Sequence, residues 1–364
     1  MMLLISILTS LLIITPTTAI PLSTSPSTTP TLLNTTAPPN ITSILSTINT
    51  PPSPIVTDAF ILNFLLTLSY LLRALYSTAL TSLSHTDFLT AGFPDPFYAS
   101  LKQIYLDEES HVWFLNKVLQ AAGVEAEREL EYVFPFGEGN VGGFVELAGV
   151  VVGVGVSAYL GALAQVDNKE YLTALSSILS VEAEHESFLR EAIGEVPFPK
   201  PFGTPLGFNQ THTLAVGFIT NFQDSVVKLP VVPFPSLTLA CTSHYYQAGV
   251  SSVTFSGAFT NAEELGIMAE TPVFAVFLSG LLKIPVRTRI LNGEDYAVDR
   301  IPEGVVGQSY VLLSRSNDDF SDSNTIAGPA IIQVYRKDMI PNTPLPACPQ
   351  SNVTKWEGVP SQGG

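Results

Sequence analysis

Two Glu-x-x-His pairs, Glu108/His111 and Glu182/His185, lie within segments whose apolar residues recur with the period of an α-helix. A spacing of three residues places the carboxylate and the imidazole on one face of a helix. Apolar residues flank both pairs, so the face that carries each pair is expected to be buried. A buried carboxylate needs a cation, a hydrogen-bond partner or a proton, because an unpaired buried charge is costly. The two pairs therefore predict a helical core with a polar or metal-binding centre.

Four long helical patterns and a shorter fifth one follow residue 57. Asp95-Pro96 is a strong helix start and Gly123 a strong stop, and the third pattern is apolar on nearly every side, which is typical of a fully buried helix. Short links join the first pattern to the second and the third to the fourth, whereas the link between the second and third is long enough to cross a bundle. We therefore expect two helical hairpins joined by one crossover. The predicted helices span residues 58–83, 96–122, 143–166, 168–193 and 208–222.

After residue 229 the pattern changes to short β-type runs separated by Pro, Gly, Asn and Asp. Short strands at near-regular spacing are typical of an antiparallel sandwich, so we predict a second, immunoglobulin-like β domain. The predicted strands span residues 237–242, 253–259, 273–278, 286–290, 296–301, 309–313 and 330–335. The predicted division of the chain is a helical domain over 57–228, a β domain over 229–340 and a tail over 341–364.

The N-terminal region predicts a secreted protein. An apolar run over residues 3–15 precedes the small residues Thr17-Thr18-Ala19, so we interpret residues 1–19 as a secretory signal peptide. Residues 20–56 are rich in Ser, Thr, Pro and Asn, and such a segment cannot bury enough apolar surface to fold. The N-glycosylation sequons, which support secretion, begin at Asn34, Asn40, Asn209 and Asn352.

Composition excludes some partners. The formal net charge is −16 and Lys and Arg are sparse, so neither nucleic acid nor an anionic lipid surface is an expected partner. We also expect no integral membrane segment in the mature chain. The two cysteines, Cys241 and Cys348, could pair in an oxidising compartment, or one could be a buried thiol and the other a tail thiol; we favour the disulfide.

The chain resembles the secreted ferritin-like proteins of fungi described as stress-response or sexual-development proteins, and more distantly the plant desiccation-related proteins. The matching stretches are Asp58-Ala-Phe-Ile-Leu-Asn-Phe, Asp107-Glu-Glu-Ser-His-Val, Val154-Gly-Val-Ser-Ala-Tyr-Leu-Gly-Ala and Val181-Glu-Ala-Glu-His, with further similarity at Ile301-Pro-Glu-Gly and Ala327-Gly-Pro-Ala-Ile. The resemblance implies an α+β protein of two domains, a ferritin-like four-helix bundle followed by an antiparallel β-sandwich.

The resemblance also implies that this chain has a degenerate di-metal site. Members with a complete site are expected to carry glutamates where this chain has Ser69 and Val152. The retained candidates, Glu108, His111, Glu182 and His185, could hold one Fe or Zn ion but not easily two. The alternative that we favour from sequence is a metal-free network of hydrogen bonds between these four side chains. Arg73, one turn beyond Ser69, is a candidate for replacing the charge of an ion.

From sequence we therefore expect a secreted ferritin-like protein that is non-catalytic and acts in stress, development or at the cell surface. The cell wall or extracellular matrix is a possible partner, and no confident catalytic residue is assigned. The alternative is an oxidoreductase with a mononuclear Fe or Zn site that uses the retained Glu-x-x-His pairs.

Overall fold

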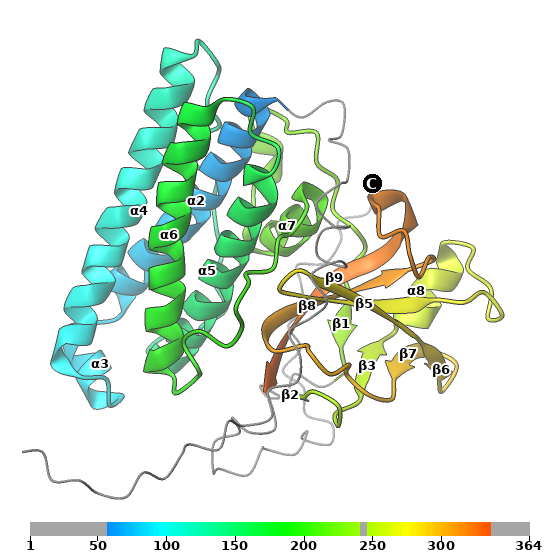
Figure 1. The fold of residues 1–364 in the computed structure, drawn as a ribbon. Coiled ribbons are helices and arrows are strands. Elements are labelled where there is room, and N and C mark those ends of the chain that lie inside the picture. The colour runs from blue at the N-terminus through cyan, green and yellow to red at the C-terminus, as the bar shows by residue number, and fades with distance from the viewer. Residues whose placement is uncertain (1–56, 241–245, 336–364) are drawn as a thin grey trace, which may run out of the picture.

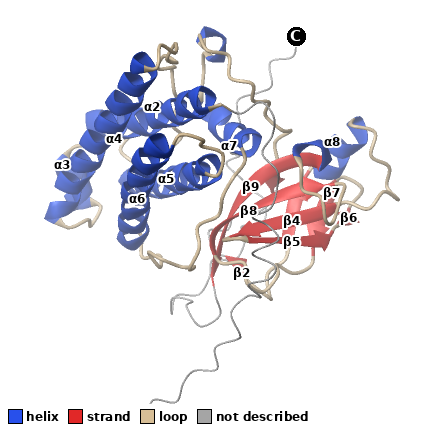
Figure 2. Cartoon of the chain, turned by 45° about the horizontal axis from the view of Figure 1, so that its top comes forward, coloured by secondary structure: helices blue, strands red, loops and turns tan. Residues whose placement is uncertain are grey.

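The computed structural model describes residues 57–240 and 246–335. A bundle of long helices forms the first half of this part of the chain, and a region of short strands forms the second (Figure 1). The same division into a helical layer and a strand region is visible in the rotated view of Figure 2. The predicted α+β organisation is therefore confirmed.

The bundle consists of α2 (Asp58–Ser82), α4 (Asp95–Ala121), α5 (Val141–Leu163) and α6 (Lys169–Ala192). Helix α2 packs mainly against α4, and α5 packs mainly against α6, so each sequential pair is a hairpin. Residues 122–140 form the crossover between the hairpins. The four predicted helices are confirmed to within two or three residues at each end.

The helix starts follow from local side-chain chemistry. The side chains of Thr57, Asn140 and Asn168 accept hydrogen bonds from first-turn amides of α2, α5 and α6, and Pro96 occupies the first turn of α4. Asp58 instead accepts from the amides of residues 167 and 168, which joins the start of α2 to the start of α6. These contacts fix where each helix begins and therefore the register of the residues that face the core.

The crossover is held to the bundle by two buried polar side chains. Asn63 of α2 donates to the carbonyl of Glu125 and accepts from the amide of Glu127. The Glu127 carboxylate accepts hydrogen bonds from the Ser225 hydroxyl and from the amides of residues 226 and 227. Glu127 thus connects the crossover to the chain that leaves the bundle.

Two short helices depart from the sequence prediction. A helix of six residues, α3 (His85–Thr90), lies in the link between α2 and α4 and begins at a capping box formed by Ser84 and Asp87. The predicted fifth helix begins at the expected residue, but α7 (Phe208–Ala215) ends earlier and continues into the 3₁₀ turns η1 (Val216–Phe218) and η2 (Phe222–Asp224).

The strands form two sheets with a shared apolar core. One has the order β1 (Thr238–Leu239), β3 (Val253–Ser256), β7 (Asp295–Val298), β6 (Arg289–Leu291); the other has the order β2 (Tyr246–Gln247), β9 (Thr325–Tyr335), β8 (Gly307–Ser314), β4 (Phe274–Ser279), β5 (Leu282–Arg287). Pairing is antiparallel except between β2 and β9, which are parallel. The prediction of a strand over 253–259 was too long, because Gly257 takes a left-handed φ of 64° and starts helix α8 (Ala258–Glu264).

Helix α5 is buried on two sides, which explains why its sequence is apolar all round. One side faces the bundle core, and the other faces the strand region through Gly153, Ser157 and Gly161, spaced one turn apart. The Ser157 hydroxyl lies 2.8 Å from the hydroxyl of Tyr310 on β8, and its carbonyl accepts from the amide of Leu206. A Cβ atom on Gly161 would lie 1.8 Å from the Leu206 carbonyl oxygen, so only glycine permits this approach.

Helices α2 and α5 are long and apolar enough to cross a membrane by length and composition alone. In the structure, 72% and 78% of their most apolar windows are buried. Packing within the bundle and against the strand region therefore accounts for their hydrophobicity.

Candidate metal centre

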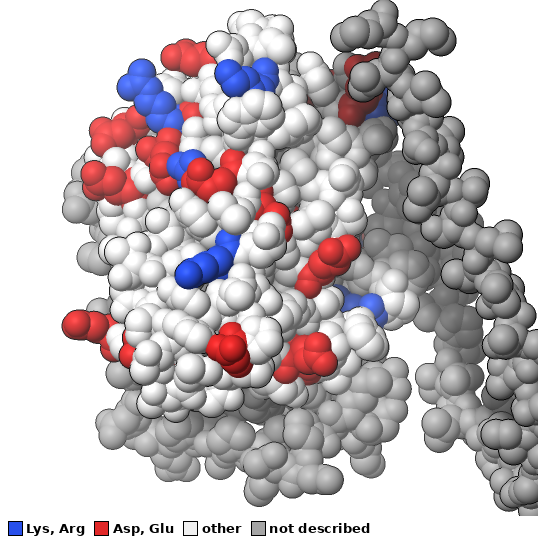
Figure 3. All heavy atoms as spheres, turned by 90° about the vertical axis from the view of Figure 1, so that its left-hand side faces the viewer, with Lys and Arg blue, Asp and Glu red and all other residues white. Residues whose placement is uncertain are grey.

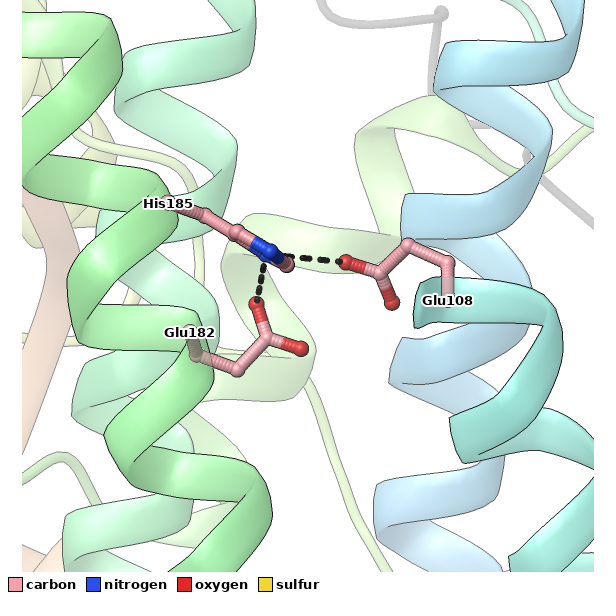
Figure 4. A group of neighbouring side chains, drawn as sticks. All are labelled: Glu108, Glu182 and His185. Atoms are coloured by element: carbon pink, nitrogen blue, oxygen red, sulfur yellow. Dashed lines mark ion pairs between the residues drawn. The ribbon is translucent and has the colours of Figure 1, made fainter. Parts of the chain in front are cut away.

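Glu108 and His111 of α4 meet Glu182 and His185 of α6 in the core of the bundle. Both glutamates have no exposed surface, and the two histidines are nearly buried. Figure 4 shows Glu108 pointing from its helix across to His185 and Glu182, which project from the facing helix. The structure therefore brings together all four residues that the sequence motif singled out.

The four side chains alternate around the centre. Nδ1 of His111 lies 3.2 Å from Glu182 Oε1 and 3.5 Å from Glu108 Oε2. Nδ1 of His185 lies 3.9 Å from Glu108 Oε1 and 3.9 Å from Glu182 Oε2. Each carboxylate thus directs one oxygen toward each imidazole.

These contacts are not hydrogen bonds. All four carboxylate oxygens and both Nδ1 atoms are buried without a hydrogen-bond partner among the described residues. The four side chains meet across the two helices as the sequence predicts, and whether they share protons or hold an ion stays a prediction. Unpartnered buried acceptors destabilise a fold unless a cation or protons occupy the space between them.

His185 has a second partner that fixes its orientation. Its Nε2 lies 3.3 Å from Oδ2 of Asp107, whose other oxygen accepts a hydrogen bond from Gln103. An ionised carboxylate only accepts, so Nε2 of His185 carries the hydrogen and Nδ1 presents its lone pair to the centre. Within the described part of the chain, Nε2 of His111 forms no such bond.

Burial and mutual proximity perturb the pKa values of the centre. Burial, and then the charge of Glu182, raise the pKa of Glu108 to about 8. Burial alone would lower the pKa of His111, but the adjacent Glu108 and Glu182 carboxylates outweigh it and raise this pKa to about 10. Both shifts favour bound protons, as expected where two buried carboxylates face each other.

Ser69 and Val152 are fully buried, but neither contributes a carboxylate. The Ser69 hydroxyl lies 3.4 Å from the hydroxyl of Tyr159 on α5. Burial, followed by the charges of Glu108 and Glu182, raises the pKa of Tyr159 and of Tyr76 on α2, so both phenols stay protonated beside the centre. Sequence reasoning missed these tyrosines, although each lies seven residues, or two helical turns, after Ser69 or Val152, where the resemblance implies a glutamate.

The prediction that Arg73 replaces the charge of an ion was wrong. Its guanidinium forms ion pairs with Glu109, at 3.2 Å, and with Glu129. Glu109 follows Glu108 in sequence but lies on the outer side of α4, with 43% of its side chain exposed. Arg73 therefore neutralises surface carboxylates rather than the buried pair.

Of the other predicted sites, only Asn209 lies within the described residues. Its amide nitrogen donates to Asp322, its amide oxygen accepts from the amide of Val232, and Thr211 of the same sequon is fully buried. A glycan on Nδ2 of Asn209 would occupy the atom that donates to Asp322, which disfavours this site. The predicted signal peptide, the segment over 20–56 and the tail lie outside the described residues, as do Asn34, Asn40, Asn352, Cys241 and Cys348.

The helical region also matches a known family. Residues 57–195 match the family model of the ferritin-like domain, and this range includes α2 to α6 and the whole Glu/His centre. The helical half of the chain is therefore a ferritin-like domain, followed by a strand region outside the match. A comparison with curated proteins gives no match.

Proposed function

We propose that the ferritin-like domain binds one divalent transition-metal ion through Glu108, Glu182 and His185. The observation that carries the proposal is the set of buried carboxylate oxygens and imidazole nitrogens that face one another and have no hydrogen-bond partner among the described residues. One ligand atom from each of the three side chains lies within 4.8 Å of the other two. A cation placed between them would satisfy atoms that protein groups leave unpaired.

The residues present fit such an ion. Two ligands held about 2.1 Å from a tetrahedral ion are about 3.4 Å apart, and Nδ1 of His185 lies 3.9 Å from one oxygen of each glutamate, so a small inward movement of these side chains would bring them to that spacing. Carboxylate oxygen and imidazole nitrogen are ligands that suit Zn²⁺ and Fe²⁺. When bound, either ion supplies a Lewis acid, and iron also supplies a redox couple.

We further propose that the ion stabilises the bundle rather than serving as a catalytic di-metal centre. Ser69 and Val152 withhold the two carboxylates that a second ion would need. The two glutamates are fully enclosed, so the described side chains leave a substrate no contact with the carboxylates. An ion shared by α4 and α6 would join the two hairpins of the bundle, because each helix belongs to a different hairpin.

An extracellular setting, in stress, development or at the cell surface, belongs to the same proposal. It is supported by the apolar N-terminal run, the sequons in the Ser/Thr/Pro-rich segment and the resemblance to secreted fungal proteins. The sparse, mixed charges on the helical face of Figure 3 give no basic patch for nucleic acid. N-terminal sequencing of protein recovered from the medium of a secretory host would test cleavage after Ala19; an intracellular, uncleaved chain would contradict it.

A metal-free scaffold is the second candidate, and the raised pKa values favour it. A proton on Glu108 and one on His111 would also offset the two buried carboxylate charges near neutral pH. In that case the centre is a structural remnant with no ligand. The two candidates differ in one measurable quantity, the metal content of the folded chain.

Elemental analysis of the full-length chain after reconstitution with Zn²⁺ or Fe²⁺ tests the proposal. We expect one ion per chain, lost in the double variant Glu108→Gln/Glu182→Gln. Glu109→Gln/Glu184→Gln is the matched control, because it removes the same charge from positions outside the centre on the same two helices. No bound metal, or equal loss in both double variants, would refute the metal site and leave the metal-free scaffold.

A further inference from the structure

The two halves of the Glu/His centre differ at one equivalent position. Asp107 precedes Glu108 on α4, whereas Val181 precedes Glu182 on α6. Exchange of the two helices would superpose Glu108 on Glu182 and His111 on His185, and Asp107 would fall on Val181. The carboxylate of Asp107 contacts His185, but the apolar Val181 offers His111 no equivalent acceptor.

This difference decides which imidazole is prepared to bind an ion. The Asp107 contact at 3.3 Å holds the hydrogen of His185 on Nε2 and directs the Nδ1 lone pair at both carboxylates. His111 lacks this constraint among the described residues and can place its hydrogen on Nδ1, toward Glu182 at 3.2 Å. Glu108, Glu182 and His185 each offer a ligand atom within 4.8 Å of the other two, although Nδ1 of His111 lies nearer to both carboxylates than Nδ1 of His185 does.

We infer that Asp107 is a positioning residue that makes the centre asymmetric, so that the ion binds on the His185 side and His111 is not a ligand. This inference rests on the proposed function and adds to it the choice between two otherwise similar histidines. Asp107 suits the role because 31% of its side chain is exposed, so its charge is partly solvated, while its partner is almost buried. Gln103 holds the other carboxylate oxygen at 2.9 Å and so fixes the orientation of Asp107.

Titration of the full-length, metal-free chain with Co²⁺, followed by its visible absorption, tests the inference. Loss of a partner that orients a metal-binding histidine typically weakens metal affinity 10- to 100-fold, so we expect about this loss for Asp107→Ala and recovery in Asp107→Glu. Glu109→Gln is the matched control, since it removes a carboxylate from the next residue of α4, which pairs with Arg73 outside the centre. A purely electrostatic or structural role would affect Asp107→Ala and Glu109→Gln alike.

The two histidines give the decisive comparison. We expect His185→Ala to abolish Co²⁺ binding and its absorption bands, and His111→Ala to keep the one-ion stoichiometry. The exchange variant Asp107→Ala/Val181→Asp should bind Co²⁺ again and should become dependent on His111. Helical circular dichroism of each metal-free variant confirms that it is folded.

The possible failures are distinguishable. Binding that depends equally on His111 and His185, or an unchanged affinity in Asp107→Ala, overturns the asymmetry but leaves the metal site standing. A wild-type chain that binds neither Co²⁺ nor Zn²⁺ overturns both the asymmetry and the proposed function.

Discussion

The buried carboxylate pair makes the metal-free domain less stable as the pH rises. Burial and the Glu182 charge raise the pKa of Glu108 from 4.5 to about 8, so between these values the native state binds more protons than the unfolded state. Native stability is then highest below pH 4.5 and falls until the pH passes 8. A pKa shift of this size corresponds to a loss of about 5 kcal/mol of unfolding free energy over the whole pH range, of which about 3 kcal/mol is lost by pH 7.

His111 acts in the same direction. Its pKa rises from 6.5 to about 10, so its stabilising contribution is complete below pH 6.5 and is lost as the pH approaches 10. The two groups share one cluster, so their contributions do not add in full. The sign is common to both, which predicts a continuous loss of stability from acid to alkaline pH.

Glu108→Gln isolates this effect, because it keeps the shape of the side chain and removes its titration. We expect the urea unfolding free energy of the metal-free variant to be nearly independent of pH between 5 and 6.5, and to fall above that only as the His111 contribution is lost. It should exceed that of the wild type by about 3 kcal/mol at pH 7. Saturating Zn²⁺ should stabilise the wild type but not the variant, since a bound ion stabilises only the state that binds it.

Unfolding monitored by helical circular dichroism gives the measurement, with Glu109→Gln as the control that removes a carboxylate from the outer side of α4. The control should retain the pH dependence and the response to Zn²⁺. If Glu108→Gln and the wild type lose stability equally between pH 5 and 8, the cluster carries no excess charge and the reasoning fails.

Three further substitutions test the fold and the reduced ligand set. Gly161→Ala places Cβ 1.8 Å from a backbone carbonyl oxygen and should lower the free energy of unfolding, measured by thermal unfolding, by about 1–3 kcal/mol. Gly217→Ala is the control and should be nearly neutral, because no atom lies within 4 Å of its Cβ. Glu127→Gln should lower the free energy of unfolding by about 1–3 kcal/mol at neutral pH, because the carboxylate accepts several hydrogen bonds. These hydrogen bonds hold the pKa of Glu127 below its usual range, so the stabilisation is lost on acidification. The variant should therefore differ little from the wild type in acid. Ser69→Glu/Val152→Glu adds two core-facing carboxylates and should raise bound Co²⁺ from one to two ions per chain by elemental analysis; unchanged stoichiometry would contradict the ligand assignment.

The helical domain was more predictable than the strand region because its signals are longer. A helix of more than twenty residues repeats its apolar face many times, and caps such as Asn168 mark its start. Helices α3 and α8 have six and seven residues, too few for a period to emerge. The strand predicted over 286–290 covers only the end of β5 and the start of β6. Strand β5 also contains Pro285, because it lies at the edge of its sheet, where the missing amide costs no ladder hydrogen bond.

At the centre, sequence spacing identified the four motif residues but not their surroundings. The partner of Asp107 lies on another helix, 78 residues away, so no local pattern could indicate their contact. The partner of Arg73 was predicted wrongly for a related reason. The spacing of one helical turn from Ser69 sets the face of α2 on which Arg73 lies, but its long side chain reaches from the edge of that face to the nearest carboxylates at the surface, Glu109 and Glu129. Contacts between helices thus depend on packing details that a single periodicity does not contain.

Charge balance connects the substituted positions to the number of ions. Four carboxylates are neutralised by two divalent ions, and the two that remain here, Glu108 and Glu182, are neutralised by one. A second ion would leave a net positive charge in an apolar core where Ser69 and Val152 offer no compensating carboxylate, and charge burial of that kind is strongly unfavourable. With three carboxylates, one divalent ion would leave a net negative charge and two divalent ions would leave a net positive charge. A serine and a valine at the two positions where the resemblance implies glutamates are therefore consistent with the proposal of one ion rather than two.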